Sequence, residues 1–448
     1  MSRRSNRRLF LKGAAGAAAT LVIGPFSSRA GTVEAKLRCA CIGVGGRGGA
    51  HVEAAVKENV VALCDSDRQR LESAASFVAK HNPKVKTFTD YRQLFDEAHR
   101  EFDVVFVATP DHHHAPASML AIKHGKHVYT EKPLAHSIYE ARCLAEAARK
   151  AGVATQMGNQ GMASEEHRRV CEYIWAGAIG PVREVHVWTD RPINWWPQGF
   201  DRPAHTDPVP QHLCWDLWLG PAPARPYAAH WREGPANGKS LYHPVNWRGW
   251  WDFGTGALGD IACHAMAPAF WALKLGKPAA VQAEHSPRTA EMFPAWSVIT
   301  YEFPARGDMP PVKLVWYDGG KKPPRPAELE PGRQLADNGV LYIGERGTML
   351  DHRIIPDEKM KQVKPPDKSI PRVPGHHEDF FLACRGARPA CSNYDFAGNL
   401  TEAALVGNVA LRAGRRIEWD AEAMKPKNCS DADVLRVIRR EYRRGWSL

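Results

Sequence analysis

The stretch Gly43-Val44-Gly45-Gly46-Arg47-Gly48 decides the fold of this chain of 448 residues. An apolar run, residues 37–44, indicates a buried strand, and residues 49–57 have the composition of a helix. In such a strand–turn–helix unit, Gly43 permits the tight turn, Gly45 lets the backbone approach a pyrophosphate, and Gly48 lets helix and strand pack closely. The helix N-terminus then offers free N–H groups to the phosphates. The sequence therefore predicts a parallel α/β domain that binds a dinucleotide.

The second strand ends in an acidic residue. Residues 60–63 form another apolar run, and Asp65 follows it, 22 residues after Gly43. An acid at this place accepts hydrogen bonds from the adenosine ribose and repels a 2′-phosphate. We therefore predict NAD in preference to NADP. The alternative is that Asp65 caps the helix that begins near Asp67. Arg47, inside the glycine turn, either pairs with a pyrophosphate oxygen or points to water.

Two further motifs follow in order. A strand over residues 103–108 leads into Thr109-Pro110-Asp111-His112-His113-His114, and Gly125-Lys126-His127-Val128-Tyr129-Thr130-Glu131-Lys132-Pro133 follows the next helix. From about residue 36 onward the chain resembles the glucose-fructose oxidoreductase, inositol dehydrogenase and rhizopine-catabolism (Gfo/Idh/MocA) family. The resemblance implies an N-terminal Rossmann domain and a C-terminal α/β domain with an open, largely antiparallel sheet. Besides the glycine turn and Asp65, it implies these cofactor-binding residues: Thr109, Pro110, His114, Glu131, Lys132 and Asn159.

Three consecutive histidines, His112, His113 and His114, raise the question of a metal site. Adjacent side chains on a loop diverge, and no cluster of carboxylates completes a ligand set. We therefore predict no metal there. Of the three, only His114 matches the pattern of the resembled family, in which this position serves local structure near the cofactor. We also expect His376-His377-Glu378-Asp379 to begin a helix, with its carboxylates near the N-terminus, and not to hold a metal.

A second active-site element is expected on a helix that opens at Asp260 and runs to about Leu275. A spacing of four places Asp260 and His264 on one face of that helix. Pro268 has no N–H for the His264 carbonyl, so the helix is expected to bend just past the histidine. The Asp-x-x-x-His pattern is similar to the second active-site element of the family. The alternative is a capping residue and a core histidine.

Oxidation of an alcohol by hydride transfer requires the hydroxyl proton to leave as well. Lys132 and His264 are the candidate acceptors, because desolvation and a nearby nicotinamide cation both favour neutral lysine. Glu131 is expected to orient the lysine. The resemblance implies that Lys132 contacts the nicotinamide ribose and the substrate hydroxyl, and that His264 shares the proton or positions a sugar. It also implies that Asp260 binds a substrate hydroxyl or fixes the imidazole tautomer.

Nine of the 15 tryptophans fall between Trp188 and Trp251, interleaved with prolines in what we expect to be a structured insertion. Flat indoles stack on the C–H faces of sugars, and their N–H groups donate hydrogen bonds. We therefore expect a carbohydrate cleft that uses two or three of these tryptophans, while the others pack the insertion or an oligomer interface. The candidate substrate-binding residues are Arg248, Trp250, Trp251, Asp260 and His264.

The N-terminus is typical of a twin-arginine export signal. Arg7-Arg8-Leu9-Phe10-Leu11-Lys12 precedes a small, uncharged run, and Ser28-Arg29-Ala30 resembles a cleavage site. A basic tail or an uncleaved anchor is the alternative, but the apolar run is shorter than the ~20 residues of a membrane-crossing helix. Removing residues 1–30 takes six positive charges and no acids from the formal +11, leaving +5. We predict an exported, periplasmic protein without stable membrane insertion.

The chain is longer than one hydrophobic core supports, so we expect several parts. They are a signal peptide (1–30), a Rossmann NAD(P)-binding domain (36–157), a substrate-binding and oligomerisation domain (158–425) and a basic C-terminal helix (426–448). The arginines of that helix are expected on a solvated face or at a contact within a homodimer or homotetramer, and not at a nucleic-acid site. The ten cysteines contain no CxxC pair and are expected to be mostly buried thiols, with one or two disulfides as the alternative.

Export and a nicotinamide cofactor together narrow the function. Outside the cytoplasm no ready pool exchanges NADH for NAD⁺, so the cofactor is most useful if each turnover restores it. We predict an NAD(P)-dependent oxidoreductase that acts on a sugar or sugar-derivative hydroxyl with tightly bound, recycled cofactor. The first alternative is an enzyme that cleaves glycosides by transient oxidation, elimination, hydration and re-reduction. The second is a sugar-binding protein without catalysis.

Overall fold

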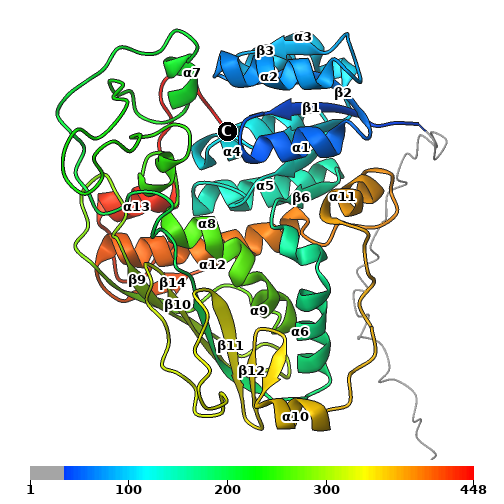
Figure 1. Ribbon diagram of the computed structural model, residues 1–448, viewed down its shortest axis with the longest axis vertical. Helices are drawn as coiled ribbons and strands as arrows, with labels where there is room; N and C mark the ends of the chain where they lie inside the picture. The colour runs from blue at the N-terminus through cyan, green and yellow to red at the C-terminus, as the bar shows by residue number, and fades with distance from the viewer. Residues whose placement is uncertain (1–34) are drawn as a thin grey trace, which may run out of the picture. The chain divides into compact units, whose positions relative to one another are not determined.

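The computed structural model describes residues 35–448, so the predicted signal peptide lies outside the described residues. The glycine turn joins the first strand and helix of a six-stranded sheet (Figure 1). Every neighbouring pair of its strands is parallel. In order across the sheet the strands are β3 (Lys86–Phe88), β2 (Asn59–Cys64), β1 (Arg38–Ile42), β4 (Val104–Val107), β5 (His127–Thr130) and β6 (Thr155–Met157). This sheet confirms the predicted Rossmann fold.

Helices connect these parallel strands, as right-handed βαβ units require. They are α1 (Arg47–Ala55), α2 (Arg68–Val78), α3 (Tyr91–Ala98), α4 (Asp111–Lys123) and α5 (Ile138–Ala151). The sequence placed the three histidines on a loop, and that expectation is wrong. They occupy the first turn of α4, which starts directly after Pro110, a residue with the φ of –57° that suits a helix start.

A second sheet of nine strands follows. Its order is β13 (Arg353–Ile355), β12 (Thr348–Leu350), β11 (Gly339–Gly344), β7 (Val182–Trp188), β10 (Val312–Tyr317), β9 (Ser297–Phe303), β8 (Ala280–His285), β14 (Ile417–Asp420) and β15 (Lys425–Pro426). Only β7 and β10 pair in parallel, and the other neighbours are antiparallel. The structure confirms the predicted, largely antiparallel C-terminal sheet.

One long helix, α12 (Tyr394–Ala413), joins the two halves. It contacts α5 and β6 of the nucleotide half and α8 and β8 of the other half, and most of its residues are buried. Leu400, Ala404 and Val406 belong to a single apolar cluster that extends into both sheets. The remaining helices are α6 (Glu165–Trp175), α7 (Trp215–Leu219), α8 (Gly256–Ala265), α9 (Ala267–Ala272), α10 (Asp357–Gln362), α11 (His376–Cys384) and α13 (Ala432–Ile438), and the 3₁₀ turns are η1 (His99–Glu101), η2 (Gln160–Ala163) and η3 (Asn246–Gly249).

Two expected helices differ from the structure. The helix expected from Asp260 to Leu275 starts earlier, at Gly256, and is divided into α8 and α9 at Met266, close to where Pro268 was expected to bend it. The expected C-terminal helix over 426–448 is wrong in extent. Only α13 is helical there, and the residues after Ile438 leave the helix because their arginines bond to other parts of the protein.

The cysteines form no disulfide. All ten lie within residues 35–448 as free thiols, and five of them are buried. Among residues 35–448, no helix combines the length and the apolar character that a membrane crossing requires.

The close approach of α1 to β1 generates the first prediction. A Cβ added at Gly48 would overlap the carbonyl oxygen of Gly43, whereas one added at Gly49 would meet only the Val44 oxygen at 3.7 Å. We expect Gly48→Ala to lower the free energy of unfolding by about 1–3 kcal/mol because backbone must move. Gly49→Ala is the matched control and should leave it unchanged or raise it by up to about 1 kcal/mol. Urea denaturation of both variants measures the difference, and equal stabilities would contradict this account.

Candidate active site

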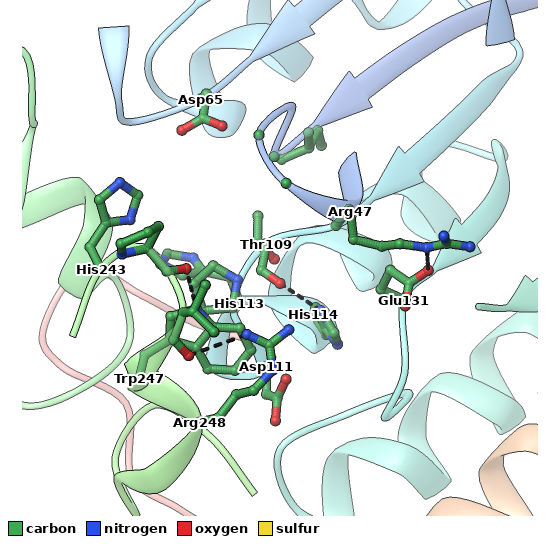
Figure 2. A pocket seen from close by; sticks show the side chains of 18 of the residues that line it. Arg47, Asp65, Thr109, Asp111, His113, His114, Glu131, His243, Trp247 and Arg248 are labelled. Carbon is green, nitrogen blue, oxygen red and sulfur yellow. Dashed lines mark hydrogen bonds and ion pairs between the residues drawn. The ribbon is translucent and has the colours of Figure 1, made fainter. Parts of the chain in front are cut away.

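A cavity of about 700 Å³ opens at the carboxyl ends of the parallel strands. Ligands of open α/β sheets bind at this edge. One side of the cavity comes from the nucleotide half, namely the glycine turn and the residues that follow β2, β4 and β5. The other side comes from residues 191–196, 243–248 and α8. Figure 2 shows Asp65 and the glycine turn on one side of this space, with Trp247, Arg248 and Asp111 below them.

The glycine turn fits a pyrophosphate. Gly43 has φ +77°, and a Cβ there would lie 2.6 Å from the Ala108 oxygen, so only glycine suits the turn. The Arg70 side chain lies against Gly45, where any Cβ would displace it. Nearby, the hydroxyl of Thr109 is buried without a partner among the described residues. A dinucleotide needs a close backbone approach and hydrogen-bond donors. The cavity offers both, in the glycine turn, the Arg70 guanidinium and the Thr109 hydroxyl.

Asp65 lies at the end of β2, where the sequence placed it. Its carboxylate accepts the backbone N–H groups of Val44 and Asp67, both at 2.9 Å. Burial raises the pKa of Asp65, although these hydrogen bonds oppose the shift. The cap of α2 is Asp67, which accepts the N–H groups of Gln69 and Arg70, so the capping alternative for Asp65 is wrong. Its contact with ribose stays a prediction.

Glu131 and Lys132, adjacent in sequence, have different partners. The Glu131 carboxylate is buried and bonds His51 at 2.9 Å, Gln160 at 3.0 Å and Arg47 at 3.3 Å (Figure 2). Burial opposes its ionisation, but His51 and the nearby cations hold the pKa of Glu131 well below its usual range. Glu131 touches Lys132 only through the backbone N–H, so it does not orient the amine as expected. Arg47 points to this carboxylate.

The Lys132 amine bonds instead to Asp260 on α8, with Nζ to Oδ1 at 2.6 Å. Arg248 donates to the same oxygen from Nε at 2.9 Å. Burial raises the pKa of Asp260, but Lys132 and Arg248 outweigh it and hold the pKa well below its usual range. Their side chains retain only 13%, 10% and 22% exposure for Lys132, Asp260 and Arg248 respectively. This carboxylate shared by two cations links the two halves at the cavity.

His264 lines the same cavity one turn after Asp260. Burial, together with the positive charge of Lys132, lowers the pKa of His264 to about 4. The ring is therefore neutral near pH 7. Among the described residues, the hydrogen bonds of the Asp260 side chain go to Lys132 and Arg248 and not to His264, so the structure gives no support to tautomer fixing by Asp260. It does bring Lys132, Asp260 and His264 together, as expected from the sequence.

His114 and Asn159 hold the surrounding backbone. His114 bonds the carbonyl oxygens of Pro133 at 2.7 Å and Thr109 at 2.8 Å, which ties the turn after β4 to the turn after β5. Asn159 is not among the residues that line the cavity, and its amide donates to the Cys263 oxygen at 3.0 Å. Asn159, two residues after β6, thus bonds to α8, and its cofactor contact stays a prediction.

The other two histidines bond to the insertion. His112 lies within hydrogen-bond distance of the carbonyl oxygens of Trp218 and Phe253, and His113 shares the Trp218 oxygen. Within residues 35–448, no group of three or more histidine, cysteine or acidic side chains has metal-binding geometry. These rings join α4 to residues 218 and 253 of the insertion.

Two of the expected substrate residues are wrong. Trp250 is 0% exposed in the core of the insertion, and Trp251 packs on Phe293 with ring centroids 3.6 Å apart. Neither lines the cavity. Trp195, Trp196 and Trp247 line it instead, with Arg248 as predicted. The sequence contains no periodicity in this region that distinguishes core from cavity indoles, and exposure does not separate them either, since Trp196 and Trp247 are only 4% and 6% exposed. Only the folded path of the insertion decides which indoles line the cavity.

Further cavity residues escaped the sequence analysis because they come from distant segments. His243, from the insertion, bonds the α2 cap Asp67 at 2.9 Å and brings the insertion to the nucleotide half. Trp446, near the C-terminus, also lines the cavity. Arg191, whose guanidinium lies 3.6 Å from the ring centroid of Trp195, belongs to the same wall.

Known proteins share the two domains of this chain. Residues 37–159 match the model of an oxidoreductase family with an NAD-binding Rossmann fold, and residues 174–448 match the C-terminal alpha/beta domain of that family. Glycosyl hydrolase family 109 protein 1 of Shewanella sp. (strain ANA-3) is 28% identical over 173 residues, 37% of this chain and 37% of that protein. The matches to such curated relatives span 35% to 48% of the relatives' own length.

Two solved structures show the same fold at low sequence identity. The WlbA dehydrogenase from Bordetella pertussis, in complex with NADH and UDP-GlcNAcA, has a TM-score of 0.58 and 18% identity, covering 86% of this chain and 99% of that one. The aldose-aldose oxidoreductase from Caulobacter crescentus, complexed with glycerol, has a TM-score of 0.51 and 18% identity, with the same coverage of 86% and 99%. The family models span both halves of the described structure, and the chain belongs to the Gfo/Idh/MocA oxidoreductase family.

Proposed function

We propose that this protein is an NAD-dependent oxidoreductase that acts on a sugar hydroxyl and restores its cofactor within each turnover. The observation that carries the proposal is the Lys132–Asp260 pair at 2.6 Å, with His264 beside it, in the cavity that the glycine turn opens. This pairing supports a role for Lys132 and His264 in handling the substrate's hydroxyl proton beside a nicotinamide bound in the cavity. The cofactor, when bound at the glycine turn and Asp65, supplies the hydride acceptor.

The residues divide the work on the hydroxyl proton. Lys132, held by Asp260, donates a hydrogen bond to the substrate oxygen. The neutral His264 ring has a free lone pair and accepts the hydroxyl proton. Because Lys132 and Arg248 both bond Oδ1 of Asp260, Oδ2 is placed to accept a neighbouring hydroxyl of the substrate. Of the two candidate acceptors expected from the sequence, Lys132 and His264, the proposal assigns the hydroxyl proton to His264.

A carbohydrate suits the remaining wall. Trp195 is 55% exposed, and Trp196 and Trp247 lie with it along the cavity beside Arg248. Indole faces next to charged hydrogen-bond donors are the combination that binds sugar rings. Two proteins of like fold, the WlbA dehydrogenase with a bound nucleotide sugar and the aldose-aldose oxidoreductase, support a sugar substrate.

A glycoside-cleaving reaction is the second candidate. It is favoured by the match to the glycosyl hydrolase family 109 protein from Shewanella, which carries that name and aligns over 173 residues. The same constellation serves it, because transient oxidation, elimination, hydration and re-reduction also begin with loss of a hydroxyl proton and a hydride. Both candidates leave the cofactor unchanged, but they differ in net outcome, since cleavage consumes water and splits one glycoside, whereas the oxidoreductase oxidises one sugar and reduces another.

The test has two steps. The nucleotide that the purified protein retains is identified by mass spectrometry, and the protein is then incubated with single sugars, with sugar pairs and with aryl glycosides. We expect NAD to be retained in preference to NADP, and a sugar pair to give one oxidised and one reduced product without net NADH. Aglycone release without oxidised product supports cleavage instead. Protein that binds sugar and transforms none is a binding protein, and that result overturns both candidates.

Lys132→Met is the matched variant for this test. It removes the amine but keeps an unbranched side chain as far as Cε, and we expect the rate to fall by about 10²- to 10⁴-fold. Lys126→Met, on the turn before β5 and outside the cavity, is the control and should retain wild-type turnover. Full activity in Lys132→Met would refute the proposed site.

The pKa of His264 gives a pH dependence. The ring accepts a proton only when neutral, and its pKa of about 4 makes it neutral throughout the range above pH 5. We therefore expect kcat/KM to stay level between about pH 5 and 7 and to fall as the pH drops through about 4, where the ring becomes an imidazolium. His264→Gln should lower the rate and remove this acid limb. An acid limb near pH 6.5 that disappears in His264→Gln contradicts the burial argument.

We also propose that the protein is exported by the twin-arginine route to the periplasm. The proposal rests on Arg7 and Arg8, on the uncharged run after them and on Ser28-Arg29-Ala30. A pathway that carries folded proteins lets a bound dinucleotide leave with the enzyme. Cell fractionation of the full chain and of a variant with Arg7→Lys and Arg8→Lys is the test. The variant is expected to stay in the cytoplasm, and equal export of both chains would refute the route.

We propose, finally, that the protein forms a homodimer or homotetramer. The support is the broad nine-stranded sheet, whose counterpart often forms the oligomer interface in the resembled family.

A further inference from the structure

The last residues of the chain form a segment, here termed the C-terminal strap (residues 439–448), that departs from α13 and crosses to the nucleotide half. Figure 1 shows it rising from α13 past α7 and ending beside α4. The contacts agree with this path, since the Leu448 carbonyl accepts a hydrogen bond from Lys123 on α4 at 2.8 Å. The strap therefore brings its side chains to the cavity although it lies some 400 residues from the glycine turn.

Charged side chains fix the strap at two places. Arg440 bonds the buried carboxylate of Glu140 on α5 at 2.7 Å, and Tyr442 donates to the same oxygen at 2.5 Å. Arg440 also donates to the His112 carbonyl at 2.5 Å. Beyond it, Arg443 pairs with Asp216 on α7 and donates to the Gly220 carbonyl at 2.9 Å. The strap is thus tied to both the nucleotide half and the insertion.

These anchors place Trp446 in the wall of the cavity. Its ring lies against Tyr91 and His113, with centroid distances of 5.8 Å and 5.4 Å. The Arg92 guanidinium lies 4.1 Å from the Trp446 ring centroid and donates to the Gly445 carbonyl at 3.1 Å. The indole is therefore held from two sides and contributes a flat apolar surface to the cavity.

Trp446 contacts the segments that follow β3 and β4, through Tyr91 and His113, and both segments lie on the Asp65 side of β5 in the sheet order. Tyr91 and Arg92 begin α3, directly after β3, and β3 is the neighbour of β2, whose end carries Asp65. Asp65 marks the ribose of the adenosine in this fold. Lys132 follows β5, on the other side of the sheet order. Trp446 thus stands at the adenosine end of the cavity, away from the reacting centre.

We infer that Trp446 binds the adenosine part of the cofactor and that the strap retains the dinucleotide. The inference rests on the proposed NAD-dependent function and adds the element that keeps NAD in place. An indole is a stacking surface for an adenine, and such contacts are worth a factor of about 10 to 100 in affinity. Release requires this wall to move, which the bonds of Arg440 and Arg443 oppose. The chain's own C-terminus thereby supplies the slow cofactor release that a self-restoring enzyme needs.

The test measures binding, independently of turnover. Purified mature protein, freed of nucleotide, is titrated by calorimetry with NADH, with AMP as an adenosine probe and with NMN as a probe that lacks adenosine. NADH release is followed by fluorescence after mixing with excess NAD⁺. We expect Trp446→Ala to weaken NADH and AMP about 10- to 100-fold and to leave NMN unchanged. Trp446→Phe, which keeps an aromatic face, should recover part of the loss.

Two more variants separate the strap from general stability. Arg443→Ala removes a strap anchor without touching the cavity and should speed NADH release, while Arg444→Ala, an exposed neighbour, should behave as wild type. Unchanged NADH and AMP binding in Trp446→Ala and Trp446→Phe overturns the inference alone. Equal weakening of NMN and AMP also overturns it, because that result indicates a structural defect. Failure of the wild-type protein to bind NADH overturns the proposed function as well.

Discussion

The structure depends on one carboxylate that two cations share. The carboxylate of Asp260 is buried on α8. It accepts hydrogen bonds from Lys132 of the nucleotide half and from Arg248 of the insertion. A buried charge of this kind is costly unless it is paired and hydrogen-bonded. The pairing therefore fixes where the turn after β5, the insertion and α8 meet. It also places the Lys132 amine toward the cavity edge of the parallel sheet, where the reaction is proposed to occur.

A second buried charge system lies beside the first but stays separate from it. Glu131 engages Arg47, His51 and Gln160, and His51 in turn bonds His377 on α11 at 2.8 Å. This network joins the first helix of the nucleotide half to α11 and holds the backbone on which Lys132 sits. These two adjacent residues thus act in different ways, since Glu131 supports the turn and Lys132 lines the cavity.

The cavity is completed by segments that lie far from the nucleotide motif. The insertion contributes His243, Trp247 and Arg248, and the strap contributes Trp446. Because α12 ties both sheets into one apolar cluster, these contributions rest on a common core. A cavity lined by the glycine turn, the insertion and the strap agrees with the proposal of an enzyme that keeps its nicotinamide cofactor between turnovers.

The sequence by itself determined the Rossmann half and the shared helical face of Asp260 and His264. These follow from local signals, since a glycine turn between a strand and a helix admits few conformations and a spacing of four places two side chains on one helical face. The antiparallel second sheet and the role of Lys132 beside that pair were expected from the resemblance to the family. Tertiary structure alone decided the partner of Lys132, the choice of Trp195, Trp196 and Trp247 over Trp250 and Trp251, and the path of the C-terminal strap. The physical reason is that burial and ion pairing join residues up to hundreds of positions apart. Residue spacing and composition indicate the local conformation of each segment. They do not indicate which distant segment packs on it in the folded protein.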